Sequence, residues 1–243
     1  MHIFLEFFRN IYIYEEIYLQ RLKMSRKTIF VTFGWTEAPI ISSILRYGLS
    51  EGDKIVVILP EQRDERSQIA LRDLKSFILG YAKNIEINEM HISLEDPVDS
   101  IARLKNAIES ERGRKCIVNL SGGMRAIVIL TYLATLFAGH PEITIELETE
   151  DRKRVIELPE IRPEDLREFR ELPSLTKEII KHLLSGPIEA SILRKKFNIP
   201  PSSFHNIQVK LVRMGYIEQE RISKFIVLKL TSRGKLLAKL AGD

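Results

Sequence analysis

Cysteine is nearly absent from the sequence, since Cys116 is the only one among 243 residues. A single thiol excludes an intramolecular disulfide framework and a cysteine-rich zinc site, and it is typical of a reducing compartment. We interpret Cys116 as a core residue of a strand rather than as a nucleophile. The histidines show no metal-ligand spacing with this cysteine, so we expect neither a metal nor a cofactor. They are His2, His91, His140, His182 and His205.

Long hydrophobic runs are also missing. The longest, residues 126–138, is interrupted by threonine and tyrosine, and it is shorter than the roughly 20 apolar residues that a membrane span needs. The apolar N-terminal stretch has no small-residue cleavage site, which argues against a signal peptide. Because 44% of the residues are hydrophobic, the chain can bury a real core. We therefore expect a soluble, cytoplasmic protein without a membrane partner.

Three glycine motifs of common enzymes do not occur in the chain. The absence of G-x-G-x-x-G disfavours a dinucleotide oxidoreductase, and the absence of G-x-x-x-x-G-K-[ST] disfavours a P-loop ATPase. No G-x-S-x-G sequence is present either, which disfavours an α/β-hydrolase. The sequence thus gives no direct indication of a catalytic site.

The first 26 residues differ from the rest of the chain. They are rich in phenylalanine, tyrosine and isoleucine, and charged residues such as Glu6 and Arg9 break the apolar runs. We interpret residues 1–26 as an N-terminal extension that forms an amphipathic helix, docked on the body or on a partner rather than on a membrane. Met24 is a plausible alternative start.

The most informative stretch lies in the middle of the chain. Residues 116–120 are mostly apolar and β-prone, Ser121 to Arg125 form a small polar turn with two glycines, and residues 126–138 have helical length. In an open parallel sheet, ligands bind outside the carboxyl ends of strands, where backbone N–H groups of the next helix point outward. Glycines let a partner approach the backbone, Ser121 can cap the helix, and Arg125 offers a planar fork to phosphate. Taken alone, an ordinary helix cap explains the turn equally well.

A second loop of the same kind follows the first predicted strand. Residues 28–33 form this strand, which runs into Gly34-Trp35-Thr36-Glu37, and Pro39 is placed as the first residue of a helix. Doubly wound sheets place the first and fourth strands next to each other. The two loops are then expected to lie side by side and to form one pocket for an anionic ligand.

The pattern of strands and helices predicts an α/β fold for residues 27–158. We expect a Rossmann-like, mostly parallel sheet with helices on both faces. The helix over residues 126–138 is apolar nearly all round, which indicates burial on more than one side and hence contact with a second subunit. The other expected strands span 54–59, 85–92, 142–148 and 154–158, and the other helices span 39–50, 63–82 and 97–112.

Charge is distributed unevenly along the chain. Residues 1–171 carry a formal net charge of −4 and residues 172–243 carry +8, which together give the formal charge of +4. Residues 159–173, framed by prolines and rich in charge, are expected to be a linker between two domains. A basic module on a neutral-to-acidic body most often contacts nucleic acid.

The basic part, residues 174–243, has the pattern of a winged helix-turn-helix domain. Helices are expected at 176–184, 188–197 and 201–214, followed by paired strands at 216–220 and 225–230 and a last helix. On the third helix, one face carries the core residues Phe204, Ile207, Leu211 and Met214. The opposite face and the hairpin tip are the expected contacts to DNA. These candidates are Ser202, Ser203, His205, Asn206, Val209, Lys210 and Arg213 on the helix, and Arg221, Ser223 and Lys224 at the tip. The alternative is a winged helix used only for protein contacts.

From residue 27 onward the chain resembles a known family. Gly34-Trp35-Thr36-Glu37 and Ser121-Gly122-Gly123-Met124-Arg125 are similar to the two ligand motifs of CARF domains, the CRISPR-associated Rossmann-like domains. Joined to a winged helix, the arrangement resembles archaeal CRISPR-associated transcription regulators, which act in antiviral defence. The resemblance implies a homodimer that binds a cyclic oligoadenylate, in particular cyclic tetra-adenylate, as a regulatory ligand. It also implies that the winged helices bind double-stranded promoter DNA of CRISPR or cas genes.

Two alternative functions are also consistent with the sequence. Some CARF proteins are slow ring nucleases, a reaction that needs little more than an oriented 2′-hydroxyl and a positive group such as Arg125. The other alternative is a DNA-binding regulator that senses a different small anion. The sequence gives neither the operator, nor the sign of regulation, nor the ring size of the ligand.

Overall fold

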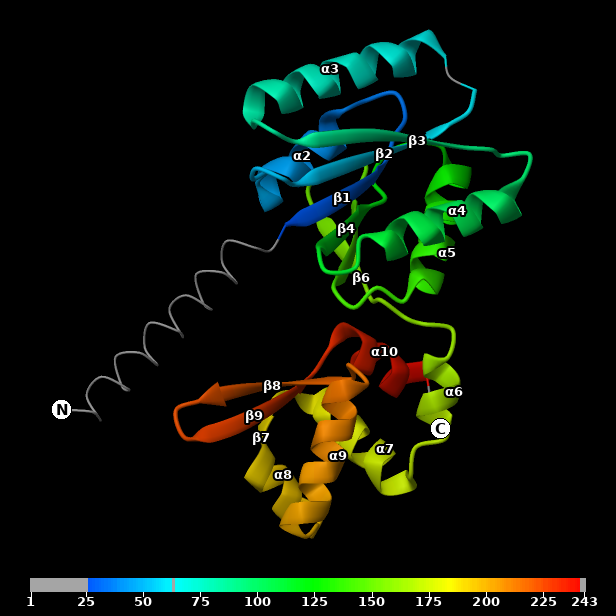
Figure 1. Ribbon diagram of the computed structural model, residues 1–243. Helices are drawn as coiled ribbons and strands as arrows, with labels where there is room; N and C mark the ends of the chain where they lie inside the picture. Colours follow the sequence, from blue (N-terminus) through cyan, green and yellow to red (C-terminus); the bar gives the residue numbers. More distant parts are fainter. Residues whose placement is uncertain (1–25, 63, 241–243) are drawn as a thin grey trace, which may run out of the picture. The chain divides into compact units, whose positions relative to one another are not determined.

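The computed structural model describes residues 26–62 and 64–240. These residues form two compact units, and the chain passes from one to the other between Glu157 and Leu158 (Figure 1). The amphipathic helix expected at the N-terminus and the alternative start at Met24 lie outside the described residues. Within the described part, none of the helices combines the length and the apolar character that crossing a membrane requires.

The first unit is built on a six-stranded sheet with the order β3-β2-β1-β4-β5-β6. β1 pairs in parallel with β2 and β4, and β2–β3 and β4–β5 are parallel as well. The strand order therefore reverses between β1 and β4, as predicted. The strands are β1 (Lys27–Thr32), β2 (Lys54–Pro60), β3 (Glu86–Ile92), β4 (Lys115–Asn119), β5 (Ile143–Glu148) and β6 (Val155–Leu158).

Helices cover both faces of this sheet, which confirms the predicted Rossmann-like fold. α2 (Ala38–Tyr47) and α3 (Glu65–Tyr81) share one core with alternate residues of the central strands, among them Ile29 and Val57. The intervening residues of the strands, such as Phe30, are fully buried as well. They point to the opposite face of the sheet because side chains alternate along a strand. α4 (Pro97–Ser110) and α5 (Arg125–Ala138) pack against each other, and α5 also contacts β1 and β2.

Local sequence explains where these helices begin. A proline, Pro39, lies in the first turn of α2, as expected. α3 begins after Asp64, whose Oδ1 accepts a hydrogen bond from the Ser67 amide at 2.7 Å. Asp96 caps α4 in the same way through the Asp99 amide at 3.0 Å. These side chains satisfy amides that a helix leaves without partners in its first turn.

The second unit has the winged helix-turn-helix fold. Its three strands have the antiparallel order β7-β9-β8. The expected helix over 188–197 begins only at Ala190, because Ile188 and Glu189 pair with β9. The elements are α6 (Asp165–Arg170), α7 (Ser174–His182), η1 (Leu183–Ser185), β7 (Ile188–Glu189), α8 (Ala190–Lys196), α9 (Pro201–Arg213), β8 (Ile217–Ile222), β9 (Phe225–Leu230) and α10 (Ser232–Leu240).

The stretch expected to be a linker, residues 159–173, is instead part of the second unit. It contains α6, and Phe169 and Leu172 belong to the hydrophobic core of this unit. Asp165 is fully buried, accepts a hydrogen bond from the Arg162 amide at 2.8 Å, and lies 3.5 Å from the Arg233 guanidinium. The expectation failed because several charged residues of this segment form ion pairs and two apolar residues anchor it in the core of the second unit.

Candidate functional site

The two candidate ligand loops lie side by side at the carboxyl ends of β1 and β4. The Thr32 hydroxyl at the end of β1 donates a hydrogen bond of 2.5 Å to the carbonyl oxygen of Gly122 in the second loop. The first loop is also tied to β2, because the Phe33 amide donates to the Ile58 carbonyl at 3.0 Å. The parallel pairing of β1 with β4 thus brings together two motifs that are almost 90 residues apart in the sequence.

Glycine is required where the two loops touch. A Cβ atom on Gly34 would lie 2.8 Å from the Gly123 Cα, and one on Gly122 would lie 2.7 Å from the Thr32 oxygen. Gly123 adopts φ +90°, and a Cβ there would lie 2.8 Å from the Phe33 oxygen. The sequence indicated that something approaches this backbone closely. In the structure each loop is approached by the other one.

Ser121 does not cap the following helix, contrary to the expectation. α5 begins at Arg125 after an extended Met124, without a side-chain cap. Ser121 instead ties its loop to β5, because its hydroxyl accepts a hydrogen bond from the Glu148 amide at 2.8 Å. The Ser121 amide in turn donates to the Asn119 side chain at 3.0 Å. Three residues separate Ser121 from α5, so the serine is too early in the chain to reach the helix amides.

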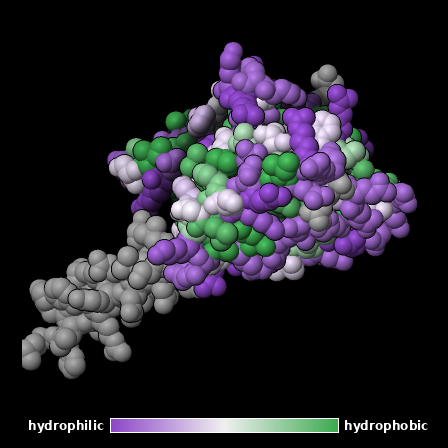
Figure 2. Space-filling model, turned by 90° about the horizontal axis from the view of Figure 1, so that it is seen from above, coloured by the Kyte–Doolittle hydropathy of each residue, from purple (hydrophilic) through white to green (hydrophobic). Residues whose placement is uncertain are grey.

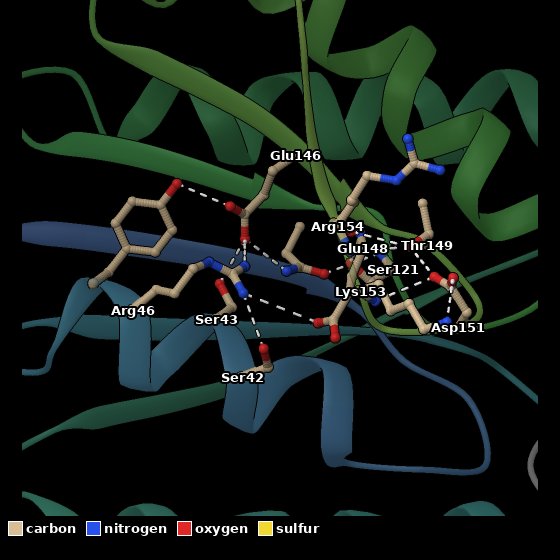
Figure 3. A network of polar contacts seen from close by, with 12 residues as sticks. Ser42, Ser43, Arg46, Ser121, Glu146, Glu148, Thr149, Asp151, Lys153 and Arg154 are labelled. Atoms are coloured by element: carbon tan, nitrogen blue, oxygen red, sulfur yellow. Dashed lines mark hydrogen bonds and ion pairs between the residues drawn. The ribbon is translucent and has the colours of Figure 1, made fainter.

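A buried carboxylate lies beneath these loops. Glu146 of β5 is 2% exposed and accepts hydrogen bonds from two neighbouring elements, as Figure 3 shows. The donors are Ser43 Oγ, Arg46 Nη2 and Asn119 Nδ2 at 2.8 Å and Tyr47 Oη at 2.9 Å. Burial, together with the nearby Glu146 carboxylate, raises the pKa of the Tyr47 hydroxyl, which keeps it protonated as a donor. This network fixes α2 to β4 and β5.

The same network reaches the second loop. Asn119 donates to Glu146 and accepts from the Ser121 amide, so one side chain joins the buried carboxylate to the loop. Arg46 also lies 4.0 Å from Glu148, the residue whose amide binds Ser121. Sequence reasoning missed Glu146 and Arg46. The available signal was a pair of glutamates at alternate positions in a strand without other charged residues.

Trp35 of the first loop is directed toward α3. Its side chain is 59% exposed, its indole Nε1 donates a hydrogen bond of 2.7 Å to Asp64 Oδ2, and the Arg66 guanidinium lies 5.4 Å from its ring centroid. Hydrogen bonds from the Ser67 amide and from Trp35 lower the pKa of Asp64. Thr36 accepts a hydrogen bond from the Ala38 amide at 3.4 Å, and Glu37 lines a groove with Trp35 and Arg66.

Met124 and Arg125 are exposed at the start of α5. Met124 lines a cavity of about 260 Å³ together with Pro60 at the end of β2 and Leu94 after the end of β3. The Arg125 side chain makes no hydrogen bond or ion pair with another residue of the described chain. Its guanidinium is thus available to a ligand beside the paired loops.

The expected DNA-contacting face of α9 is exposed in the second unit. Phe204 and Leu211 are buried, and Ile207 and Met214 are half-buried, as the helical spacing predicted. All seven candidates are exposed, namely Ser202, Ser203, His205, Asn206, Val209, Lys210 and Arg213. Gln208, which sequence reasoning missed, is 9% exposed and donates a hydrogen bond of 2.6 Å to Gln219 on β8. A polar side chain therefore joins this helix to the wing.

Acidic residues flank this face. Glu168 of α6 and Glu171, which follows α6 directly, line the same groove as His205, Asn206 and Arg213 of α9. Sequence reasoning placed these glutamates in a linker and so missed that they lie beside the basic face. They restrict where a phosphate backbone can approach α9, because like charges repel over short distances.

The tip of the wing is tighter than expected. β8 extends through Ile222, so the turn consists of Ser223 and Lys224 rather than four residues. Ser223 adopts φ +57°, as two-residue hairpin turns require. Arg221, Ser223 and Lys224 are exposed, and Lys224 Nζ lies 5.3 Å from the Phe225 ring centroid. The three candidate residues are brought together at one end of the hairpin.

Cys116 is fully buried in β4, with its sulfur 3.3 Å from His140 Nε2. Burial and the nearby Glu111 carboxylate raise the pKa of this thiol to about 12, so it is not a reactive thiolate at neutral pH. Its interpretation as a core residue is confirmed. Among residues 26–62 and 64–240, the side chains of histidine, cysteine, aspartate and glutamate form no group of three that could hold a metal ion.

Among known proteins, the family described as the Csa3 CRISPR-associated Rossmann-like domain matches residues 27–159. A comparison with curated proteins found no match. Solved structures that match include Lactococcus lactis ZitR in complex with DNA, at 19% identity over 28% of this chain and 49% of that chain, with a TM-score of 0.27. The adhesin competence repressor AdcR from Streptococcus pyogenes matches at 18% identity over 30% of this chain and 57% of that chain, with a TM-score of 0.28.

The chain thus covers about half the length of these solved structures. The family match, in contrast, covers the whole sheet of the first unit and both candidate ligand loops. We conclude that this chain belongs to the family with a Csa3 CRISPR-associated Rossmann-like domain.

Proposed function

We propose that this protein is a ligand-responsive transcription regulator of a CRISPR-Cas system. In this proposal a homodimer binds a cyclic oligoadenylate, in particular cyclic tetra-adenylate, and binds double-stranded promoter DNA through its winged helices. The observation that carries the proposal is the pairing of the two loops at the strand-order reversal of a CRISPR-associated Rossmann-like domain, in one chain with a winged helix-turn-helix unit.

The chemistry of the loop region supports an anionic ligand. Ligands of open α/β sheets bind outside the carboxyl ends of the strands where the order reverses, and here this place is occupied by both loops. The start of α5 has no side-chain cap, so its first amides are available to an anion. Arg125, exposed at the same helix end, adds a positive group with a fork that suits phosphate. The residues proposed to bind the ligand are Gly34, Trp35, Thr36, Glu37, Ser121, Gly122, Gly123, Met124 and Arg125.

The surface of α5 supports the homodimer. Large hydrophobic side chains are exposed in several places, as the green patches of Figure 2 show, so exposure alone does not single out this helix. After Arg125, however, α5 contains no charged residue, although Ile129 and Phe137 are 57% and 52% exposed. A solvated helix face normally carries charged residues. A second copy of the chain would cover this face and repeat both loops across a two-fold axis.

Ligand screening by thermal unfolding tests the proposal. A ligand that binds only the folded state raises stability by RT ln(1 + [L]/Kd), so cyclic tetra-adenylate should raise the Tm of the wild-type protein in a dose-dependent way. Linear tetra-adenylate is the matched control, because it has the same bases without the ring. Stabilisation by another small anion and by neither oligoadenylate would contradict the ligand assignment and favour a regulator of a different signal.

A slow ring nuclease is a second candidate, and the unpaired Arg125 side chain favours it. A positive group beside the loops could stabilise the charge that develops when a 2′-hydroxyl attacks the neighbouring phosphate. Incubation of labelled cyclic tetra-adenylate with the protein separates the two functions. Linear products that disappear with Arg125→Ala indicate an enzyme, and an intact ring indicates a receptor.

A further inference from the structure

The chain contains a single tryptophan, Trp35, and it lies in the first ligand loop. Although the side chain is 59% exposed, two groups from another element hold it. Its Nε1 donates to Asp64 Oδ2 at 2.7 Å, and the Arg66 guanidinium lies 5.4 Å from the ring centroid. An exposed side chain is ordinarily free to change rotamer, so this pair of contacts gives the indole a defined orientation.

Asp64 is itself rigidly placed. It is the N-cap of α3, and its Oδ1 accepts a hydrogen bond from the Ser67 amide at 2.7 Å while Oδ2 binds the indole. The Ser67 hydroxyl also donates to the Asp64 carbonyl at 2.9 Å. The hydrogen bonds from the Ser67 amide and from Trp35 also lower the pKa of the Asp64 carboxyl, because both are made to its charged form. The orientation of Trp35 is therefore fixed relative to the start of α3, a helix that packs on the sheet.

Arg66 adds a second constraint. A guanidinium close to an indole ring is attracted to it by the quadrupole of the ring. The exposed remainder of the indole offers an aromatic surface, and nucleobases of any sequence stack on such surfaces. Binding is tighter when the stacking side chain is already oriented, because less rotamer freedom is lost on association.

We propose that Asp64 and Arg66 are positioning residues that hold Trp35 as a preformed stacking surface for a nucleobase of the ligand. This inference rests on the proposed function, because it takes a cyclic oligoadenylate as the ligand. It adds the N-cap residue of α3 and a residue of the first turn of α3 to a site that sequence motifs place only in the loops after β1 and β4.

The variants must separate the contact with Trp35 from the capping of α3. Asp64→Ser keeps a side-chain oxygen for the Ser67 amide but is too short to reach the indole. Asp64→Asn keeps one acceptor oxygen and replaces the other with an amide donor, so it can accept from the Ser67 amide or from the indole but not from both through separate oxygens, and it should fall between the wild type and Asp64→Ser. Asp73→Ser is the charge control, because Asp73 lines the same groove and makes no hydrogen bond with the indole. Thermal unfolding of each variant verifies that it is folded.

Fluorescence without ligand tests the positioning directly, since all emission from tryptophan comes from residue 35. Asp64→Ser should lower the steady-state anisotropy and increase acrylamide quenching, and Asp64→Asn should do so to a smaller extent, whereas Asp73→Ser should match the wild type. A structural change elsewhere that spared the indole would not alter this signal. Identical anisotropy and quenching in the wild type and Asp64→Ser would overturn the positioning role.

Calorimetric titration with cyclic tetra-adenylate tests the stacking. We expect Asp64→Ser and Arg66→Gln to weaken binding by about two- to tenfold, the range that immobilising one rotamer-rich side chain implies. Unchanged affinity in a variant whose indole has become mobile would overturn the stacking role. If the wild type itself binds no cyclic tetra-adenylate, the proposed function fails and the stacking role with it. The anisotropy comparison still decides whether Asp64 holds the indole.

Discussion

Glu146 shows how a single residue can organise the region beneath the ligand loops. Its carboxylate is 2% exposed and receives four hydrogen bonds from α2 and β4. A buried charge of this kind is tolerated only when hydrogen bonds or ion pairs compensate its loss of solvation. Removing one partner leaves the other polar groups buried without a hydrogen-bond partner. The residue therefore connects the position of α2, which follows the first loop, to Asn119 and the second loop.

We predict that Glu146→Ala lowers the free energy of unfolding by about 3–5 kcal/mol, because Arg46 and Asn119 lose their buried acceptor. Urea denaturation followed by circular dichroism measures the change. Glu142→Ala, an exposed glutamate just before the same strand, should stay within about 0.5 kcal/mol of the wild type. Equal stability of the two variants would mean that the buried network does not stabilise the fold.

Glu111 gives a prediction about pH. Burial tends to raise the pKa of its carboxyl, but hydrogen bonds from Lys54 and Thr28 at 2.8 Å outweigh it, and the pKa lies below its ordinary value of 4.5. A carboxyl with a depressed pKa stabilises the folded state above its unfolded pKa, and this contribution disappears as the pH falls through the folded pKa. Glu111→Gln should thus be less stable than the wild type at pH 7. The difference should shrink in denaturation curves recorded below pH 4.5, and a constant difference would contradict it.

The two loops act as one element because their backbones are in contact. Gly123→Ala places a Cβ 2.8 Å from the Phe33 oxygen at φ +90°. Gly113→Ala is a matched control, since Gly113 has φ +94° and a Cβ there would meet no atom within 4 Å. We predict that Gly113→Ala costs about 1–2 kcal/mol from backbone strain alone. Gly123→Ala should cost clearly more in denaturant titrations and should weaken ligand binding as well. Equal costs would show that the loop contact is not tight in solution.

The helix α9 and the wing tip are predicted to play different parts on DNA. Asn206→Ala should relax sequence preference at one base pair, at about 1–3 kcal/mol for the lost contact, because asparagine reads base edges. Lys224→Ala should weaken specific and non-specific binding alike and lower the salt slope by about one unit. Fluorescence anisotropy with promoter DNA and scrambled DNA measures both. If Asn206→Ala changed the affinity for promoter DNA and for scrambled DNA equally, α9 would not be the element that recognises the base sequence.

The elements that could be predicted are those whose sequence pattern lies within the element itself. The buried strand before Gly34 and the apolar helix after Arg125 carry their own periodicity, so the strand order and the adjacency of the two loops followed from general rules for α/β sheets. α6 was missed because the segment has many charged residues and few buried apolar ones, such as Phe169 in the helix and Leu172 just after it. The partners of Ser121, Trp35 and Glu146 were missed because each comes from a distant segment, and no local pattern encodes such a pairing.

At the scale of the whole molecule, the proposed pocket is incomplete in one chain. The loops occupy the strand-order reversal, yet the face of α5 that continues from them, with Ile129 and Phe137, is uncovered. In an isologous interface each loop appears twice around the axis, so one ring would contact both copies of Arg125. The stoichiometry of binding is thus a direct consequence of the proposed architecture.

Isothermal titration calorimetry of cyclic tetra-adenylate with the wild-type protein, on a sample whose dimeric state is verified by light scattering, measures this stoichiometry. The account predicts one ring per two chains, and affinity lower by several-fold or more in Arg125→Ala, since a charge-assisted hydrogen bond contributes about 1.5–3 kcal/mol. One ring per chain, or no binding at all, would contradict it.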